Sequence, residues 1–140
     1  ELGIKCIGIC RGSQVLCSFQ PNGRLVQHQN NPHYIHPIHT YDGKTLLISS
    51  THHQAQYPYD MNPDDYKLLA WTEGISEYHL NGKDEEISDK PFKEAEIVYY
   101  PKTKCLGIQG HPECLYGDVK YDDTIKYLQN MLDEFMNNKL

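Results

Sequence analysis

The sequence lacks the features that would place it among several common protein classes. Its five cysteines include no C-x-x-C pair and are odd in number, which argues against a disulfide framework. No apolar run reaches the roughly 18 residues that a membrane-spanning helix needs. Positive charge is scarce, with 13 Lys and Arg against 19 Asp and Glu and a formal net charge of −6. We therefore expect neither a nucleic-acid nor a membrane partner.

The remaining composition is that of an ordinary globular protein, with 39% hydrophobic residues and 11 tyrosines in 140 residues. A chain of this length predicts a single domain over residues 1–140. Reduced thiols indicate a cytoplasmic location. The chain begins with Glu1, and a β-like run starts at Ile4. This start predicts that an N-terminal part of the domain is missing.

Hydrophobic periodicity predicts helices at both ends of the chain and strands between them. The helical runs are 14–19 and a C-terminal stretch from Tyr121, where Ile125, Leu128, Leu132 and Phe135 share one face. The expected strands are 4–9 (buried), 36–41, 45–50, 66–71, 76–80, 97–100 and 105–109. Segments 28–39 and 52–65 are expected as mainly loops, and 83–96 as charged surface. This arrangement favours the α/β class.

The stretch GICRGSQVL, residues 8–16, places Cys10 between a strand and a helix. Gly8 and Gly12 flank it and are expected to relieve crowding at a sharp turn. The helix N-terminus that follows should favour the thiolate, and the Arg11 amide is placed to donate to a developing oxyanion. The pattern predicts a nucleophile elbow with a sulfur nucleophile. The alternative is a core cysteine behind a buried strand.

The stretch GIQGHPE, residues 107–113, supplies a base for such a nucleophile. His111 and Glu113 are two apart in a segment expected to be extended, so their side chains should face the same way, and Pro112 stiffens the segment between them. His111 can take a proton from Cys10 while Glu113 fixes its tautomer. The alternative is a surface His-Pro turn.

Three motifs in this order, GICRGSQ, SSTHHQA and GIQGHPE, resemble the class I glutamine amidotransferase superfamily, whose members carry a Cys-His-Glu triad. The middle motif is most similar to the γ-glutamyl hydrolase branch, grouped as peptidase family C26. The resemblance implies a flavodoxin-like α/β sheet with a nucleophile elbow, of which this chain is the C-terminal portion. It lacks the family's N-terminal strands and the glycine-rich loop that gives the second oxyanion donor, so the piece is expected to have half an oxyanion hole.

The resemblance also implies a role for each matching residue. Cys10 would form a γ-glutamyl thioester, His111 would act as base and then acid, and Glu113 would orient it. Oxyanion and substrate contacts would come from Arg11, Gln14, His52, His53 and Gln54. The substrate would be glutamine or another γ-glutamyl compound, from which ammonia or an amine is released. No cofactor is implied; a synthase domain or subunit would receive the ammonia in coupled members of the family.

Two other functions compete with this interpretation. The histidines His33, His36 and His39 are spaced at three, and His52 and His53 follow, which suggests a metal site. Prolines interrupt any helix there, so no metal is expected. A domain that kept the fold but lost the chemistry would be a binding or regulatory module, although all three triad candidates are present. The other cysteines, Cys6, Cys17, Cys105 and Cys114, are expected to pack in the core.

Overall fold

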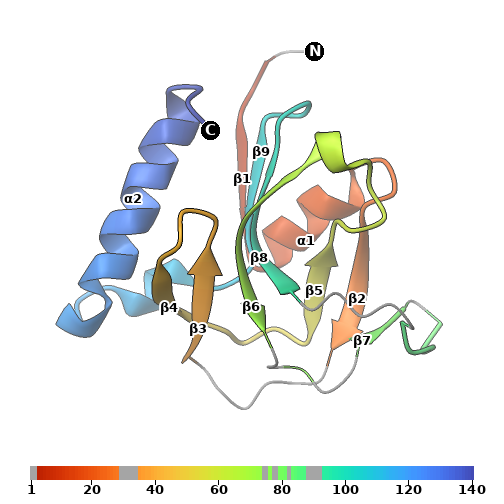
Figure 1. Cartoon of the computed structure of the whole chain (residues 1–140), viewed down its shortest axis with the longest axis horizontal. Helices are drawn as coiled ribbons and strands as arrows, with labels where there is room; N and C mark the ends of the chain where they lie inside the picture. Colours follow the sequence, from red (N-terminus) through yellow and green to blue (C-terminus); the bar gives the residue numbers. More distant parts are fainter. Residues whose placement is uncertain (1–2, 29–34, 74–75, 77–78, 82, 88–92) are drawn as a thin grey trace.

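The computed structural model describes residues 3–28, 35–73, 76, 79–81, 83–87 and 93–140. Its main sheet has six strands in the order β1-β9-β8-β6-β3-β4, and a smaller sheet has the order β5-β2-β7 (Figure 1). The main-sheet strands are β1 (Cys6–Ile9), β9 (Cys105–Ile108), β8 (Lys93–Tyr100), β6 (Lys67–Glu73), β3 (Ile35–Thr40) and β4 (Thr45–Ser49). The smaller sheet comprises β5 (Gln54–Tyr57), β2 (Arg24–His28) and β7 (His79–Leu80).

The pairing of β1 with β9 decides where the site forms. The two strands run parallel, with Ile9 opposite Ile108, whereas the other neighbouring strands of the main sheet are antiparallel. The amide of Cys10 continues the pairing by donating to the Ile108 carbonyl at 2.8 Å. Because parallel strands end at the same edge of a sheet, the segments after Ile9 and after Ile108 leave the sheet side by side.

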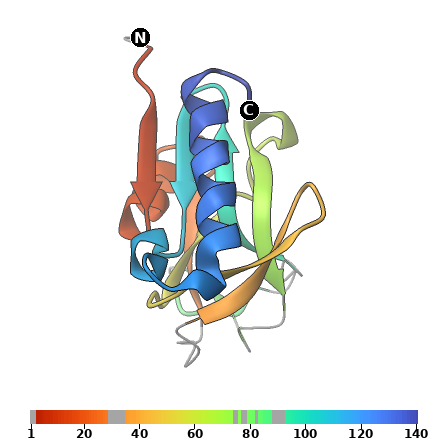
Figure 2. The same cartoon turned by 90° about the vertical axis from the view of Figure 1, so that its left-hand side faces the viewer.

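Helices cover the main sheet on both faces. Helix α2 (Asp122–Met136) buries Leu128, Met131 and Phe135 in a core that includes Ile97 and Leu106 (Figure 2). Two aspartates in its first turn suit the helix dipole. Helix α1 (Arg11–Ser18) lies on the other face (Figure 1), and its Cys17 belongs to a second cluster that includes residues of β8.

Short 3₁₀ turns complete the fold: η1 (Pro63–Asp65), η2 (Pro112–Leu115) and η3 (Val119–Tyr121). Within the described part of the chain, neither helix has the length and apolar character needed to cross a membrane.

Most expected elements are present, with shifts at their ends. The C-terminal helix and the hairpin of β3 and β4 are confirmed. The prediction of a buried first strand was wrong. Ile7 and Ile9 are 45% and 41% exposed, because β1 is at the sheet's edge and pairs on one side only within the described residues.

Two segments predicted as irregular or exposed contain buried strands. The expected loop 52–65 includes β5, which pairs with β2, a strand that the sequence patterns did not predict. The expected charged surface 83–96 includes the start of β8, where Glu94 and Glu96 are buried. Long-range pairing with other strands decides both cases, and local patterns do not report it. The predicted strand 76–80 lies partly outside the described residues; β7 covers its last two positions.

Candidate active site

Cys10 has a strained backbone at the start of α1. Its φ is 50° and its ψ is −109°, in a region that residues other than glycine rarely adopt. Hydrogen bonds hold the turn: the Ser13 hydroxyl donates to the Cys10 carbonyl at 2.7 Å, and the Gln14 amide donates to it at 3.2 Å. Such strain at a strand-to-helix turn is typical of a nucleophile elbow.

The two flanking glycines are not equivalent. A Cβ at Gly8 would lie 2.5 Å from both the carbonyl carbon and the oxygen of Gly12, so the close approach of α1 to β1 requires glycine there. A Cβ at Gly12 would have no neighbour within 4 Å. The prediction that both glycines relieve crowding was therefore right for Gly8 and wrong for Gly12.

The pKa of Cys10 is raised above its usual value, contrary to the expectation of a stabilised thiolate. Burial is the largest cause, and the Glu113 carboxylate raises it further. The backbone amide and the guanidinium of Arg11 both lower it, but they do not outweigh burial. A thiol in this state needs a base to become a nucleophile.

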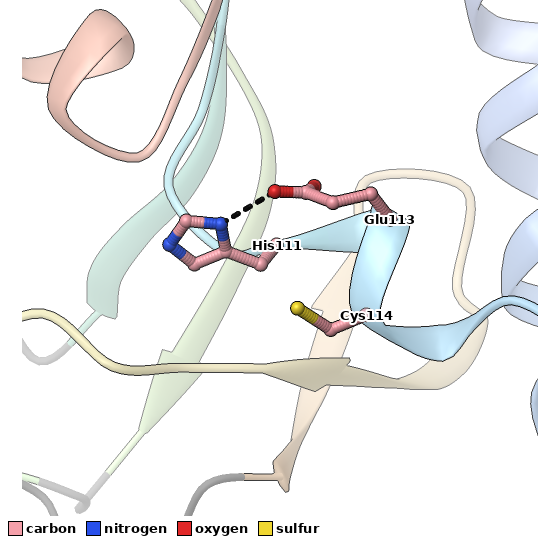
Figure 3. A group of neighbouring side chains, drawn as sticks. All are labelled: His111, Glu113 and Cys114. Carbon is pink, nitrogen blue, oxygen red and sulfur yellow. Dashed lines mark hydrogen bonds and ion pairs between the residues drawn. The ribbon is translucent and has the colours of Figure 1, made fainter.

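His111 and Glu113 form a hydrogen-bonded pair just beyond the end of β9. The distance from His111 Nδ1 to Glu113 Oε1 is 2.7 Å (Figure 3), and this bond lowers the pKa of the carboxyl group. The imidazole is 25% exposed and the carboxylate 56% exposed. The segment is not extended as predicted: η2 begins at Pro112, and the turn brings the two side chains together.

The backbone of His111 is fixed by β4. The His111 amide donates to the Ser49 carbonyl at 3.1 Å, and the Ser49 hydroxyl donates to the His111 carbonyl at 2.6 Å. The structure thus places Cys10 and the His111–Glu113 pair directly after two adjacent parallel strands, and the Glu113 charge is one of the causes of the raised pKa of Cys10.

A pocket lies beside Cys10, with a volume of about 420 Å³. This volume suits a small molecule. Its lining includes every pocket residue predicted from the sequence, and Thr51 in addition; the lining residues are Cys10, Arg11, Gln14, Thr51, His52, His53 and Gln54. Residues from α1 and from the segment before β5 thus share one cavity.

Hydrogen bonds tie the two walls of the pocket together. The Arg11 guanidinium donates to the side-chain oxygens of Gln14, at 3.0 Å, and of Gln54. The Gln14 side-chain amide donates to the Gln54 carbonyl at 2.6 Å. Arg11 therefore holds the side chains of Gln14 and Gln54 together at the pocket wall.

A buried cluster of histidines and carboxylates, which the sequence patterns did not predict, backs the same wall. His52 Nδ1 lies 3.1 Å from the Gln54 carbonyl and 2.9 Å from His28 Nε2. His28 Nδ1 is 2.7 Å from the Ser76 hydroxyl, which donates to Glu94 Oε2 at 3.0 Å. These contacts form a continuous path from a buried carboxylate to the pocket wall.

The cluster also includes two histidines beside its carboxylates. His79 Nε2 is 3.5 Å from Glu94 Oε1, and His36 Nε2 is 3.1 Å from Glu96 Oε1. Burial lowers the pKa of His28 to about 4 and lowers that of His52 as well. In the sequence, His36 and His52 belong to the histidine-rich set, but the alternation of Glu94 and Glu96 at the start of a strand is more typical of a solvated face.

The histidine set proposed for a metal does not assemble as the spacing suggested. His33 lies outside the described residues, and His36 and His39 are at odd spacing on β3, so they face opposite sides of the sheet. A different group is compact enough to hold a metal: His111, Glu113 and Cys114 each offer a ligand atom within 4.8 Å of the other two. Cys114 and Cys6 are exposed, contrary to the expected packing role, whereas Cys17 and Cys105 are buried.

Comparison with known proteins identifies the fold. No protein-family model and no curated protein matches the chain. One similar solved structure is of a protein described as a GMP synthase subunit, from Thermoplasma acidophilum. The match covers 97% of this chain and 61% of that protein's chain, with a TM-score of 0.55 and 14% sequence identity. A second is of a glutamine amidotransferase from Thermotoga maritima. The match covers 96% of this chain and 49% of that protein's chain, with a TM-score of 0.48 and 15% sequence identity. The first likeness shows that the chain shares the α/β fold of that protein, and the chain spans less than two thirds of either protein.

Proposed function

We propose that this chain carries the catalytic centre of a cysteine-dependent enzyme that cleaves the γ-amide of glutamine or of another γ-glutamyl compound. The observation that carries the proposal is the strained Cys10 at the end of β1, next to the strand whose continuation bears the His111–Glu113 pair. The glutamine amidotransferase-like fold and the pocket beside Cys10 support the same conclusion.

In the first half of the proposed reaction, His111 removes the thiol proton and the Cys10 sulfur attacks the amide carbon. Because Nδ1 of His111 is bonded to Glu113, Nε2 is the atom that would exchange the proton. The new S–C bond gives a tetrahedral oxyanion, to which the Arg11 amide would donate. The C–N bond then breaks, and His111 returns the proton to the departing ammonia or amine.

In the second half, water replaces the departed amine. His111 takes a proton from the water, whose oxygen attacks the thioester carbon. The C–S bond breaks, glutamate is released, and the proton returns to the Cys10 sulfur. The raised pKa of Cys10 accords with this sequence, because the thiol remains protonated until a base acts on it.

The proposal places the α-substituents of the substrate in the pocket formed by Gln14, His52, His53 and Gln54. The hydrolase-like motif SSTHHQA favours a stand-alone enzyme of the γ-glutamyl hydrolase, or peptidase C26, type. A coupled enzyme would instead pass ammonia to a synthase domain or subunit. All five cysteines are free, which suits a reducing compartment such as the cytoplasm.

A diazo-ketone analogue of glutamine tests the proposal directly. Its methylene carbon should be attacked by Cys10, with loss of dinitrogen, and peptide mapping should find the adduct on Cys10. Ammonia release from glutamine, measured against other γ-glutamyl amides, should then identify the substrate class. The Cys6→Ser variant is the matched control, because it removes an exposed thiol elsewhere and should label normally. Absence of both labelling and ammonia release in a full-length form would instead indicate a binding module.

A further inference from the structure

The turn after β9 holds a third reactive side chain that the proposed reaction does not use. Cys114 follows Glu113 in η2 and is exposed. Figure 3 shows its sulfur turned toward the side chain of His111, whose imidazole is hydrogen-bonded to the carboxylate of Glu113. One ligand atom from each of the three residues lies within 4.8 Å of the other two.

These three side chains offer a set of donors that zinc prefers. Imidazole nitrogen, carboxylate oxygen and thiolate sulfur bind Zn²⁺ at about 2.0–2.3 Å, so that ligand atoms around a tetrahedral ion lie roughly 3.3–3.8 Å apart. The present separations are within 4.8 Å, and His111 Nδ1 and Glu113 Oε1 are 2.7 Å apart. Small rotations of exposed side chains would therefore complete the geometry, leaving a fourth position open for water.

The backbone at this turn is held in place while the side chains are free to adapt. Hydrogen bonds in both directions join His111 to Ser49, and the Cys114 amide donates to the His111 carbonyl at 3.1 Å. Exposure of the Glu113 and Cys114 side chains gives an ion direct access from solvent. The site thus needs no local unfolding to load.

The buried cluster around His28 contains more imidazoles but is a poorer candidate. Among the described residues, His111, Glu113 and Cys114 are the three that bring one ligand atom each within 4.8 Å of the other two. An ion entering the buried cluster would also lose its water in the core before meeting any ligand.

We propose that His111, Glu113 and Cys114 bind Zn²⁺ or a similar thiophilic divalent ion, and that the bound ion switches off proton transfer by His111. On binding, the Cys114 thiol releases its proton to solvent, the proton on His111 Nδ1 moves by exchange with water to Nε2, and metal–ligand bonds replace the hydrogen bond between His111 and Glu113; no electron is transferred. With Nε2 protonated and Nδ1 bound to the ion, His111 has no free nitrogen to accept the Cys10 proton. The binding site stands on geometry alone, whereas its inhibitory effect rests on the proposed function.

Cobalt is the probe for the binding site. Metal-free protein titrated with Co²⁺ should develop a thiolate-to-cobalt absorption band, which one equivalent of Zn²⁺ should abolish. The Cys114→Ser variant should lose the band and bind Zn²⁺ at least about tenfold more weakly in calorimetry. The Cys6→Ser and Cys10→Ser variants should keep the band. A Cys114→Ser variant that binds Zn²⁺ as tightly as the unchanged protein would overturn the proposal, as would the absence of the band.

Activity measurements separate this inference from the proposed function. Zn²⁺ should suppress ammonia release, a chelator should restore it, and the Cys114→Ser variant should require at least about tenfold more Zn²⁺ for the same loss relative to its own metal-free rate. If the metal binds but the unchanged protein neither releases ammonia nor is labelled at Cys10, the proposed function is wrong while the metal site stands. If ammonia is released and Zn²⁺ at saturation has no effect, the inhibitory role fails alone.

Discussion

Two groups of histidines and carboxylates serve the region around Cys10, and burial separates their properties. His111 and Glu113 lie on a turn where the imidazole is 25% exposed and the carboxylate 56% exposed. His28, at the end of β2, His52, before β5, and Glu94, on β8, form the buried group, with His28 1% exposed and Glu94 7% exposed. Both groups contain a histidine beside a carboxylate, but the first is open to solvent, whereas the second is buried and reaches the pocket beside Cys10 through His52.

The difference shows how environment assigns roles to identical side chains. In the buried group, desolvation disfavours the charged imidazole and lowers the pKa of His28 to about 4, so this residue is neutral near neutral pH. A neutral, fully surrounded imidazole fixes the direction of hydrogen bonds and so supports the pocket wall at Gln54. In the exposed group, the imidazole has solvent access and a neighbouring thiol, and proton transfer is the role that the proposal gives it.

Removal of each imidazole in turn is the strongest test of this division. We expect His111→Asn to lower kcat for ammonia release by about 10²–10⁴-fold, the usual contribution of a general base. His28→Asn should instead lower the stability and raise KM, with kcat close to that of the unchanged protein. Steady-state kinetics on both variants, with circular dichroism to confirm folding, measures the contrast. An equal loss of kcat in the two variants would show that the division is wrong.

Acid should destabilise the protein through the buried group. The folded pKa of His28 is about 4 and the ordinary pKa of histidine is 6.5, so between these values the unfolded chain binds more protons and stability falls as pH falls. The contribution of neutral His28 to the free energy of unfolding is fully present above pH 6.5 and is lost by about pH 4. It amounts to at most about 3 kcal/mol. Urea unfolding at several pH values measures it. A variant with His28→Gln should show a shallower fall, and an identical slope would refute the assignment.

The elbow that presents Cys10 to both groups can be tested with two matched substitutions. Gly8→Ala should reduce the free energy of unfolding by about 1–3 kcal/mol, because its Cβ would meet the backbone of Gly12 at 2.5 Å. Gly12→Ala has open space and lies in a helix, so it should be neutral or slightly stabilising. Denaturant titration compares the two. Equal effects would mean that the approach of α1 to β1 does not constrain this turn.

The carboxylate of the exposed pair should have the smallest effect. We expect Glu113→Gln to lower kcat about tenfold, because the neutral amide can still contact His111 but no longer stabilises its protonated form. The effect should be modest, since a half-exposed carboxylate is screened by water. Initial rates of ammonia release measure it, with Asp118→Asn, at an exposed acidic residue beyond η2, as the control for lost surface charge. A loss as large as that of His111→Asn would place the carboxylate closer to the chemistry than its exposure suggests.

Sequence patterns singled out the residues of the exposed site, whereas of the buried group they indicated only His52, as a pocket residue. Cys10, His111 and Glu113 belong to short motifs in which glycine and proline mark turns. Such motifs can be recognised in the sequence without knowledge of the fold. The buried group draws His28, Ser76 and Glu94 from separate elements, and Glu94 lies in a stretch rich in charge. Its burial depends on the contact of β8 with β5 of the smaller sheet, which no local pattern reports.

The amino-acid sequence alone determined the α/β class, the turn chemistry around Cys10 and the identity of the residues proposed for catalysis, because these depend on local periodicity and on chemically distinctive side chains. The tertiary structure decided the solvent exposure, the pKa values and the neighbours of those residues. Burial raised the pKa of Cys10 where local reasoning expected a stabilised thiolate, and the parallel pairing of β1 with β9 brought residues a hundred positions apart to one edge. Solvation and long-range pairing are properties of the packed molecule, and they exist only once the chain has folded.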